Sequence, residues 1–276
     1  MSLRLGIDTG GTFTDAVLVD DDKTIVAAEK SLTTRFDLVI GIGEVISKLP
    51  TDKLKQITMV SLSTTLTTNS VVEDLGAPVC VLLPGYNEAQ VKQSGLLDIL
   101  PAQFVVILGG GYDAVGVEQQ ALDEDAARAA ILKLQDQVSA FAISSLFGTR
   151  NSSHEMRLKA LVIELTDMPV ICGNELASSL GAPRRALTAA LNARMVPPIK
   201  ELIRSVLKVM DQHKIDAPLM IVKGDGSLAS LDNAIEKPIS TVLSGPAASV
   251  IGACQLSGLQ NAIVADMGGT TTDIAI

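Results

Sequence analysis

Aromatic residues are scarce in this chain of 276 residues, which has no tryptophan, two tyrosines and five phenylalanines. Hydrophobic residues nevertheless make up 47% of it. The core must therefore be built from Val, Ile, Leu and Ala, which is typical of an α/β protein with buried strands. The length predicts one large domain or two of medium size, with ample apolar surface to bury.

Histidine and cysteine are also few, and this excludes several kinds of enzyme. The chain has two histidines and three cysteines, and it contains no His-Glu-x-x-His, Cys-x-x-Cys or Gly-x-Ser-x-Gly pattern. The common zinc hydrolase and serine esterase sites are thereby excluded. A P-loop is excluded too, because Gly-x-x-x-x-Gly-Lys-Ser/Thr is absent. Cys80, Cys172 and Cys254 lie far apart in apolar surroundings, so we expect buried, reduced thiols in a cytoplasmic protein.

Positive charge is in deficit, since 22 Lys and Arg stand against 31 Asp and Glu for a formal net charge of −9. This balance argues against nucleic acid as a partner, because a phosphate backbone requires a basic surface. No signal sequence is visible at the N-terminus, and no uninterrupted apolar run reaches about 18 residues. We therefore expect no membrane partner and no spanning segment.

Two short loops stand out among the residues that are present. DTGGTFTD (residues 8–15) and DMGGTTTD (residues 266–273) share the pattern Asp-x-Gly-Gly-Thr-x-Thr-Asp, and each lies between two apolar runs. This arrangement predicts strand, tight turn, strand. A Gly-Gly turn lets backbone N–H groups approach an anion closely, threonine adds hydroxyl donors, and the leading aspartate can hold Mg²⁺ directly or through water.

The repetition of the loop predicts two similar halves that close on one nucleotide, ATP with Mg²⁺. A single loop of this kind would favour an ordinary hairpin, but two copies with the same Asp, Gly and Thr positions favour phosphate binding. Asp15 and Asp273 fit a turn-capping role as well as a functional one. The predicted catalytic and metal-binding residues are Asp8 and Asp266, and the predicted phosphate-binding residues are Gly10, Gly11, Thr12, Thr14, Gly268, Gly269, Thr270, Thr271 and Thr272.

Periodicity places these loops among alternating strands and helices. One long helical pattern, residues 184–210, contains Pro197 and Pro198, where we expect a kink. The other predicted helices cover residues 37–49, 123–137, 152–165 and 247–256, and the predicted strands cover residues 3–7, 13–19, 24–32, 57–63, 78–83, 138–146, 170–172, 219–222 and the hairpin 262–276.

Three polar segments carry candidate substrate contacts. The segment Ser63–Asn69, with Thr64, Thr65, Thr68 and Asn69 as candidate contacts, could line a substrate cleft, or it could cap a helix. His154 and Glu155 could contact substrate as an acid–base pair, but Ser152-x-x-Glu155 is also a capping box before an apolar helix, which we favour. For residues 224–227, Gly-Asp-Gly-Ser, an ordinary turn after a strand is favoured over a ligand-facing one.

Six motifs together resemble the hydantoinase A / 5-oxoprolinase family, which belongs to the superfamily of actin, sugar kinases and heat-shock chaperone ATPases. They follow the family's order and cover essentially the whole chain. Serine stands at 63, 70 and 152 where the family usually has Gly, Ala and Pro. The motifs are RLGIDTGGTFTDAVLVD (4–20), STTLTTNSVVEDLGAPVCVL (63–82), NSSHEMR (151–157), TAALNARMVPPI (188–199), SGPAASVIGA (244–253) and DMGGTTTDIAI (266–276).

The resemblance implies the ribonuclease-H-like ATPase fold, a mixed sheet flanked by helices. Residues 1–180 would form the N-terminal lobe with the first phosphate loop, and residues 181–276 would begin the second lobe with the second loop. Family members continue beyond the second loop, so we expect the second lobe to be truncated here.

The same resemblance implies ATP- and Mg²⁺-dependent opening of a small cyclic amide, of hydantoin or 5-oxoproline type, by phosphorylation of the ring carbonyl. It also implies a hydantoinase B type subunit as partner. The alternatives are an ATP-binding subunit of an acetone-type carboxylase, which phosphorylates an enolate, and a catalytically incompetent nucleotide-binding fragment. The residue patterns by themselves predict only phosphoryl transfer from Mg-ATP.

Overall fold

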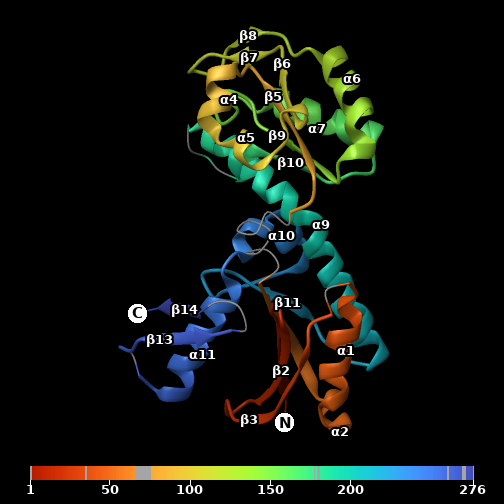
Figure 1. The fold of residues 1–276 in the computed structure, drawn as a ribbon, viewed down its shortest axis with the longest axis vertical. Helices are drawn as coiled ribbons and strands as arrows, with labels where there is room; N and C mark the ends of the chain where they lie inside the picture. Colours follow the sequence, from red (N-terminus) through yellow and green to blue (C-terminus); the bar gives the residue numbers. More distant parts are fainter. Residues whose placement is uncertain are drawn as a thin grey trace. The chain divides into compact units, whose positions relative to one another are not determined.

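A computed structural model (Figure 1) describes residues 2–34, 36–65, 76–176, 178, 181–259, 261–268 and 272–275. The chain forms two compact units, one from residues 1–69 with 198–276 and one from residues 70–197. The first unit is discontinuous because the chain leaves it after residue 69 and returns along helix α9 (Ala182–Gln212). These boundaries differ from the division near residue 180, because the second half of α9 packs into the core of the N-terminal segment.

The first unit contains a six-stranded mixed sheet in the order β12-β11-β4-β1-β2-β3. Three strands form an antiparallel meander, while β4 runs parallel to β1 and β11 runs parallel to β4. This arrangement confirms the predicted α/β, ribonuclease-H-like fold. The strands are β1 (Leu3–Thr9), β2 (Phe13–Asp20), β3 (Ile25–Leu32), β4 (Ile57–Thr64), β11 (Leu219–Val222) and β12 (Leu228–Ala229).

One face of this sheet carries the main core of the unit. Leu3, Leu5 and Ile7 alternate along β1 and are buried, as the period of two requires. They belong to one apolar cluster with helix α1 (Leu38–Lys48) and with residues 199–210 of α9. The predicted helix at 37–49 is confirmed as α1, and the side chain of Asp37 caps it by accepting the N–H of Val39. Full burial of one such aliphatic side chain stabilises the fold by about 1.5–3 kcal/mol.

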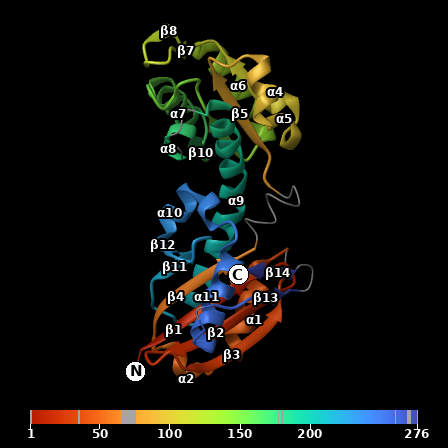
Figure 2. The same cartoon turned by 90° about the vertical axis from the view of Figure 1, so that its left-hand side faces the viewer.

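Helix α11 (Ser244–Ser257) contacts β4 and β11, on the other side of the sheet from α1 (Figure 1). Figure 2 shows the hairpin of β13 (Val264–Met267) and β14 (Thr272–Ala275) beside α11. The short helices of this unit are α2 (Thr51–Leu54), α10 (Leu231–Glu236) and η3 (Pro238–Thr241).

The stretch Pro238–Ser257 is long and apolar enough to cross a membrane by length and composition, although no spanning segment was expected. The stretch is interrupted at Leu243, whose φ is 63°, in the left-handed region. The uninterrupted helix α11 has 14 residues. It therefore spans about 21 Å at 1.5 Å per residue, which is shorter than the hydrocarbon core of about 30 Å.

The second unit has a four-stranded parallel sheet in the order β10-β9-β5-β6. Every residue of β5 is buried, as expected for a central parallel strand. The strands are β5 (Val79–Pro84), β6 (Val105–Leu108), β9 (Ala140–Ile143) and β10 (Val170–Cys172), with a small hairpin of β7 (Gly111–Tyr112) and β8 (Glu118–Gln120). The helices are α4 (Glu88–Ser94), α5 (Leu96–Ile99), η1 (Ala102–Phe104), α6 (Glu124–Leu134), η2 (Gln135–Gln137), α7 (Ser153–Leu165) and α8 (Gly173–Leu176).

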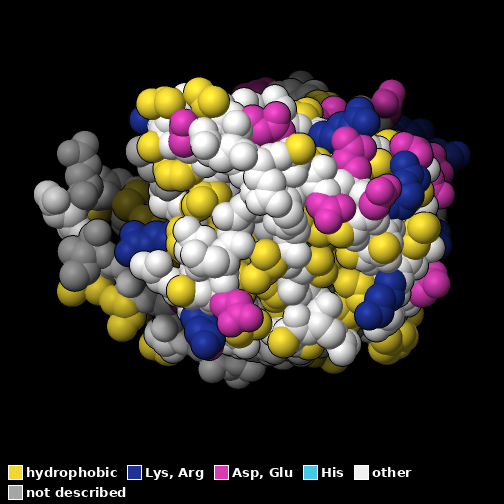
Figure 3. Space-filling model, turned by 90° about the horizontal axis from the view of Figure 1, so that it is seen from above, with side chains coloured by type: hydrophobic (Ala, Val, Ile, Leu, Met, Phe, Trp, Pro, Cys, Tyr) yellow, Lys and Arg dark blue, Asp and Glu magenta, His cyan; other side chains and the backbone are white. Residues whose placement is uncertain are grey.

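The cysteines divide between interior and surface. Cys80 and Cys172 are buried free thiols, as predicted. Burial raises the pKa of the Cys80 thiol to about 12. Cys254 is exposed, so the prediction of three buried thiols is wrong for this residue, which lies on an outer face of α11. On the face of the molecule drawn in Figure 3, basic and acidic side chains are intermixed.

Candidate phosphate site

The first Gly-Gly loop is a tight turn at the end of β1. The strands pair Asp8 with Asp15 and Thr9 with Thr14, and the N–H of Gly10 donates to the carbonyl of Phe13 at 2.9 Å. A Cβ on Gly10 would lie 3.0 Å from that carbonyl oxygen, so glycine allows the turn to close. The predicted strand–turn–strand is confirmed here.

The second loop has the same register. Strands β13 and β14 pair Asp266 with Asp273 and Met267 with Thr272, which repeats the pairing of the first hairpin position by position. Gly268 and Thr272 are exposed. The predicted phosphate-binding residues Gly269, Thr270 and Thr271 lie outside the described residues.

Helix α11 lies against the leading aspartate of each hairpin. Its first residue, Ser244, bonds through its hydroxyl to both backbone groups of Thr64 at the end of β4, at 3.2 Å to N and 3.1 Å to O. A Cβ on Gly245 would lie 3.8 Å from Oδ1 of Asp8. Ser249 is one helical turn further along the same face, and its hydroxyl donates to Oδ2 of Asp266 at 2.5 Å. The two leading aspartates therefore lie at successive turns of one helix face.

Negative charge is concentrated around Asp8. Burial raises the pKa of this carboxyl, and Asp15 and Asp266 raise it further, while the hydroxyl of Ser63 and the charge of Lys30 lower it. The Ser63 hydroxyl donates to Oδ1 of Asp8 at 2.6 Å. The ammonium of Lys30 lies 3.1 Å from Asp15. The pKa of this half-buried carboxylate is raised by two neighbouring carboxylates. Such a concentration of negative charge attracts a cation.

The donor set fits magnesium held together with phosphate. Across the described part of the chain, no group of three or more His, Cys, Asp or Glu forms a metal cage. Mg²⁺ needs none, because it commonly takes one or two carboxylates with water and phosphate oxygens. The hydroxyls of Thr9 and Thr65 are buried at the carboxyl ends of β1 and β4. Neither hydroxyl donates or accepts a hydrogen bond among the described residues. They leave hydrogen-bonding capacity at the same end of the sheet.

A cavity of about 180 Å³ lies between α11 and the second hairpin. Both hairpin aspartates contribute to its wall, as does Ser249. The lining residues are Leu243, Pro246, Ser249, Val250, Val264, Asp266, Asp273, Ile274 and Ala275.

Several predicted residues are placed differently from what the patterns suggest. Thr14 is buried and its hydroxyl pairs with that of Thr33 at 2.9 Å, because alternation along β2 turns it into the sheet. Thr64 is fully buried, with its backbone tied to Ser244. Thr65 is half-buried beside the first loop, with its N–H donating to Thr9. Thr68 and Asn69 lie outside the described residues. Gly11 and Thr12 are half-buried in the first turn.

His154 and Glu155 lie in the second unit, and the predicted capping box is wrong. The hydroxyl of Ser152 caps no backbone group among the described residues. Glu155 has no exposed surface. Its carboxylate accepts the N–H groups of Ser145 at 2.8 Å and Asn174 at 2.9 Å, at the carboxyl ends of β9 and β10. It joins two strands to α7, and its contact with substrate stays a prediction.

His154 is almost as deeply buried. Its Nε2 lies 2.8 Å from a carboxylate oxygen of Glu118, and its ring packs on Tyr112 with centroids 4.3 Å apart. Its backbone N–H donates to the Tyr112 hydroxyl at 2.9 Å. These contacts fix the start of α7 against the β7–β8 hairpin, and the substrate role of His154 likewise stays a prediction.

The turn after β11 is the ordinary one that we favoured. The carboxylate of Asp225 folds back on its own turn, where it accepts the N–H and hydroxyl of Ser227 at 2.9 and 2.6 Å. These hydrogen bonds lower the pKa of Asp225 to about 2. A Cβ on Gly224 would lie 2.1 Å from the carbonyl of Val242, so this glycine is required for packing.

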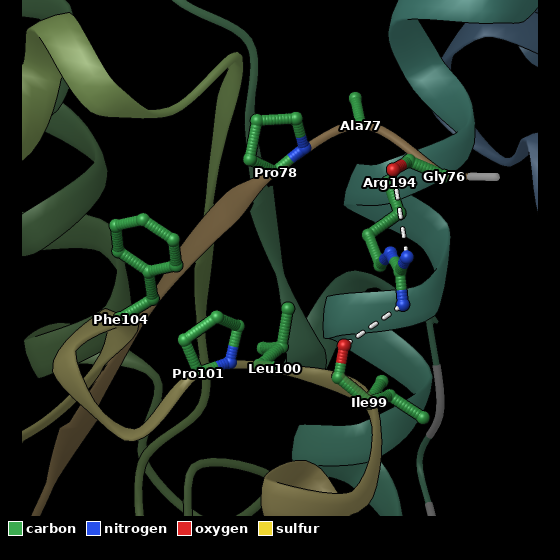
Figure 4. Close-up of a pocket in the computed structure, with 8 residues that line it drawn as sticks. All are labelled: Gly76, Ala77, Pro78, Ile99, Leu100, Pro101, Phe104 and Arg194. Carbon is green, nitrogen blue, oxygen red and sulfur yellow. Dashed lines mark hydrogen bonds between the residues drawn. The ribbon is translucent and has the colours of Figure 1, made fainter. Parts of the chain in front are cut away.

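The second unit has a pocket of its own (Figure 4), of about 190 Å³, with mostly apolar walls. The guanidinium of Arg194 crosses it and donates to the carbonyls of Ile99 at 3.0 Å and Gly76 at 3.4 Å. Arg194 therefore joins α9 to two loops of this unit. None of the residues predicted for phosphate binding lines this pocket.

Sequence reasoning missed Ser63, Gly245 and Ser249. Ser63 was placed in a segment that could line a substrate cleft, but its contact with Asp8 was not predicted, although parallel pairing opposite Asp8 places the two side chains on the same face. Gly245 lies before the predicted helix 247–256, whereas the structure begins α11 at Ser244 and so places Gly245 and Ser249 four apart on one face. The missing information was which strand and which hairpin this face meets.

Two family models match this chain. Residues 4–166 match the hydantoinase/oxoprolinase N-terminal region, and residues 185–276 match the hydantoinase/oxoprolinase family. The chain belongs to the hydantoinase/oxoprolinase family. The caprolactamase subunit alpha of Pseudomonas jessenii is 30% identical over 99% of this chain and 43% of its own length.

Two solved structures are similar to this hydantoinase/oxoprolinase family member. The ATP-dependent caprolactamase from Pseudomonas jessenii has a TM-score of 0.79 at 28% identity, over 98% of this chain and 43% of that one. A nucleotide-free acetone carboxylase structure has a TM-score of 0.82 at 22% identity, over 99% and 44%. The second likeness shows the shared fold. The chain spans less than half the length of these relatives.

Proposed function

We propose that this chain supplies the phosphate- and magnesium-binding part of an ATP-dependent enzyme that opens a cyclic amide. The observation that carries the proposal is the placement of two equivalent Asp-led hairpins along one face of α11. Membership of the hydantoinase/oxoprolinase family supports the cyclic-amide class of substrate. The name of the relative at 30% identity, a caprolactamase subunit, supports it too.

The loops would bind ATP through its phosphates. Backbone N–H groups and hydroxyls at Gly11 and Thr12 would surround phosphate oxygens from one side, where Gly10 closes the turn, and those at Gly268 and Thr272 from the other. Asp8 and Asp266 would hold Mg²⁺, which neutralises charge on the phosphates when it is bound. Phosphoryl transfer depends mainly on such positioning and charge neutralisation. The N-terminal end of α11 adds a positive dipole end beside Asp8.

The transferred group would be the γ-phosphoryl. It would pass from ATP to the carbonyl oxygen of the ring and leave ADP. The resulting imidate-like phosphate has a better leaving group than the amide, so water can attack the ring carbon. Collapse of the resulting tetrahedral carbon with cleavage of the C–N bond would free the ring nitrogen and leave an acyl phosphate. A second water would then hydrolyse the acyl phosphate to a carboxylate and inorganic phosphate. We further propose a hydantoinase B type subunit as partner, which agrees with the subunit naming of the caprolactamase relative.

A carboxylase is the second candidate, because the same fold is found in acetone carboxylase. In that case the phosphoryl acceptor would be the enolate of a ketone. A nucleotide-binding module without turnover is the third. The three differ in which compound, added to the protein, stimulates release of ADP.

Nucleotide binding and turnover test the proposal. We expect calorimetry to detect binding of Mg-ATP, and ADP release to rise with caprolactam, hydantoin or 5-oxoproline but not with acetone plus bicarbonate. Asp8→Asn and Asp266→Asn should abolish turnover while circular dichroism shows an intact fold. Asp225→Asn is the matched control, since this aspartate lies in an exposed turn of the same unit.

Each result decides between the candidates. Stimulation by acetone with bicarbonate alone would favour the carboxylase. Binding of Mg-ATP without stimulated release of ADP would favour the nucleotide-binding module without turnover, and absence of ATP binding to the wild-type chain would contradict all three candidates. Near-normal turnover in either Asn variant would show that the residue has no metal role.

A further inference from the structure

Each leading aspartate is held by a serine from a different element. The hydroxyl of Ser63 on β4 donates to Oδ1 of Asp8 at 2.6 Å, and the hydroxyl of Ser249 on α11 donates to Oδ2 of Asp266 at 2.5 Å. The two hairpins share a register, but the two serines come from a strand and a helix with no sequence relation. The same contact has thus been made twice by independent parts of the chain.

The opposite oxygen of each carboxylate is left without a partner. In the described part of the chain, no hydrogen bond or ion pair reaches Oδ2 of Asp8 or Oδ1 of Asp266. By contrast, the second aspartate of the first hairpin, Asp15, is paired with Lys30. One oxygen of each leading aspartate is therefore fixed, and the other remains available as a ligand.

We propose that Ser63 and Ser249 are positioning residues that orient Asp8 and Asp266 so that one oxygen of each carboxylate meets the divalent cation. This inference rests on the proposed function. A hydrogen bond to an ionised carboxylate is short and strong, and it restricts rotation of the aspartate side chain. Partners that orient a ligand in this way commonly change metal affinity or activity by about 10–100-fold when they are removed.

The register explains why Ser63 serves Asp8. Parallel pairing puts the two residues opposite each other on neighbouring strands, with their side chains on the same face. Ser63 is itself buried, so its hydroxyl is kept away from competing water. Ser249 reaches Asp266 from the wall of the cavity between α11 and the second hairpin. Both serines hold their aspartates from outside the Gly-Gly turns.

The test measures cation affinity with Mn²⁺ as the probe, by electron paramagnetic resonance in the presence of a non-hydrolysable ATP analogue. Ser63→Ala and Ser249→Ala should each weaken Mn²⁺ binding about 10-fold, while binding of the analogue without metal stays near the wild-type value. Ser63→Thr and Ser249→Thr keep the hydroxyl and should restore most of the affinity. Ser31→Ala is the matched control, because this buried serine bonds the carbonyl of Gly41 in the same unit.

The outcomes separate this inference from the proposed function. If the wild-type chain binds no Mn²⁺ with the nucleotide analogue, the proposed function is overturned. If the wild type binds and both Ala variants bind equally well, the positioning role is overturned. Should Ser63→Ala fail to fold, Ser63→Cys keeps the volume with only a weak donor, and wild-type affinity in that variant would contradict the role of Ser63.

Discussion

Glu155 is the most deeply buried acidic side chain among the described residues. Its contacts allow a prediction of how its substitution changes stability. Its two oxygens accept hydrogen bonds from Ser145 and Asn174, so both ends of the carboxylate are used as acceptors. Glu155→Gln would turn one acceptor into a donor that faces another donor. We expect a loss of about 1–3 kcal/mol in the free energy of unfolding, measured by urea denaturation.

The difference in stability between wild type and Glu155→Gln should change with pH in a definite direction. Burial raises the pKa of Glu155 above its ordinary value of 4.5 in the folded state. The protonated form is thus favoured by folding, so this contribution to stability is fully present below pH 4.5 and is lost as pH rises through the folded pKa. The stability difference between wild type and Glu155→Gln should therefore narrow with rising pH.

At the scale of elements, α11 offers a matched pair of glycine substitutions. Gly252 is inside the helix, and a Cβ added there meets nothing within 4 Å. Gly252→Ala should stabilise the protein by about 0.5–1 kcal/mol, because alanine loses less backbone entropy in a helix. Gly258 ends the same helix at φ 69°, so Gly258→Ala should destabilise it. Thermal denaturation of both variants tests the pair, and equal shifts would contradict it.

Local signals fixed most elements correctly, and the exceptions have physical causes. The predicted helices at 37–49 and 123–137 are found as α1 and α6, and Asp37 and Asp123 cap them. The expected strand at 138–146 shortens to β9 (Ala140–Ile143), because Ser144 and Ser145 turn away to meet Tyr86 and Glu155. The Ser-x-x-Glu spacing before α7 failed because Glu155 found buried N–H groups of two strands, which periodicity along one helix cannot reveal.

Helix α9 shows the same limit over a longer range. The pattern at 184–210 predicted a helix, and the structure extends it through Pro197 and Pro198 to 31 residues. What the pattern could not show is that its two halves belong to different units. Ile199, Leu202 and Ile203 pack with strands near the N-terminus, and such a long-range pairing depends on tertiary contacts.

The candidate site was predictable only in part for a related reason. The repeated Asp-Gly-Gly-Thr loops were visible in the sequence, and their hairpins and registers are confirmed. Ser63 and Ser249 were not found, since each acts on a residue from another element. Thr14 was assigned to the phosphates by motif position, but strand alternation places it inside the sheet.

At the scale of the whole molecule, the exposed apolar surface of the first unit predicts self-association. Leu256, Ile263 and Ile274, on α11, the following loop and β14, are each at least 70% exposed. Large apolar side chains exposed to this extent favour association or aggregation. We expect the chain to form concentration-dependent oligomers in sedimentation velocity experiments and to bind the dye ANS. The double variant Leu256→Lys with Ile263→Lys should shift the chain toward monomer and lower dye binding. Val115→Lys removes an equally exposed apolar side chain from the second unit and should leave both unchanged. A wild-type chain that stays monomeric and binds no dye would contradict this prediction.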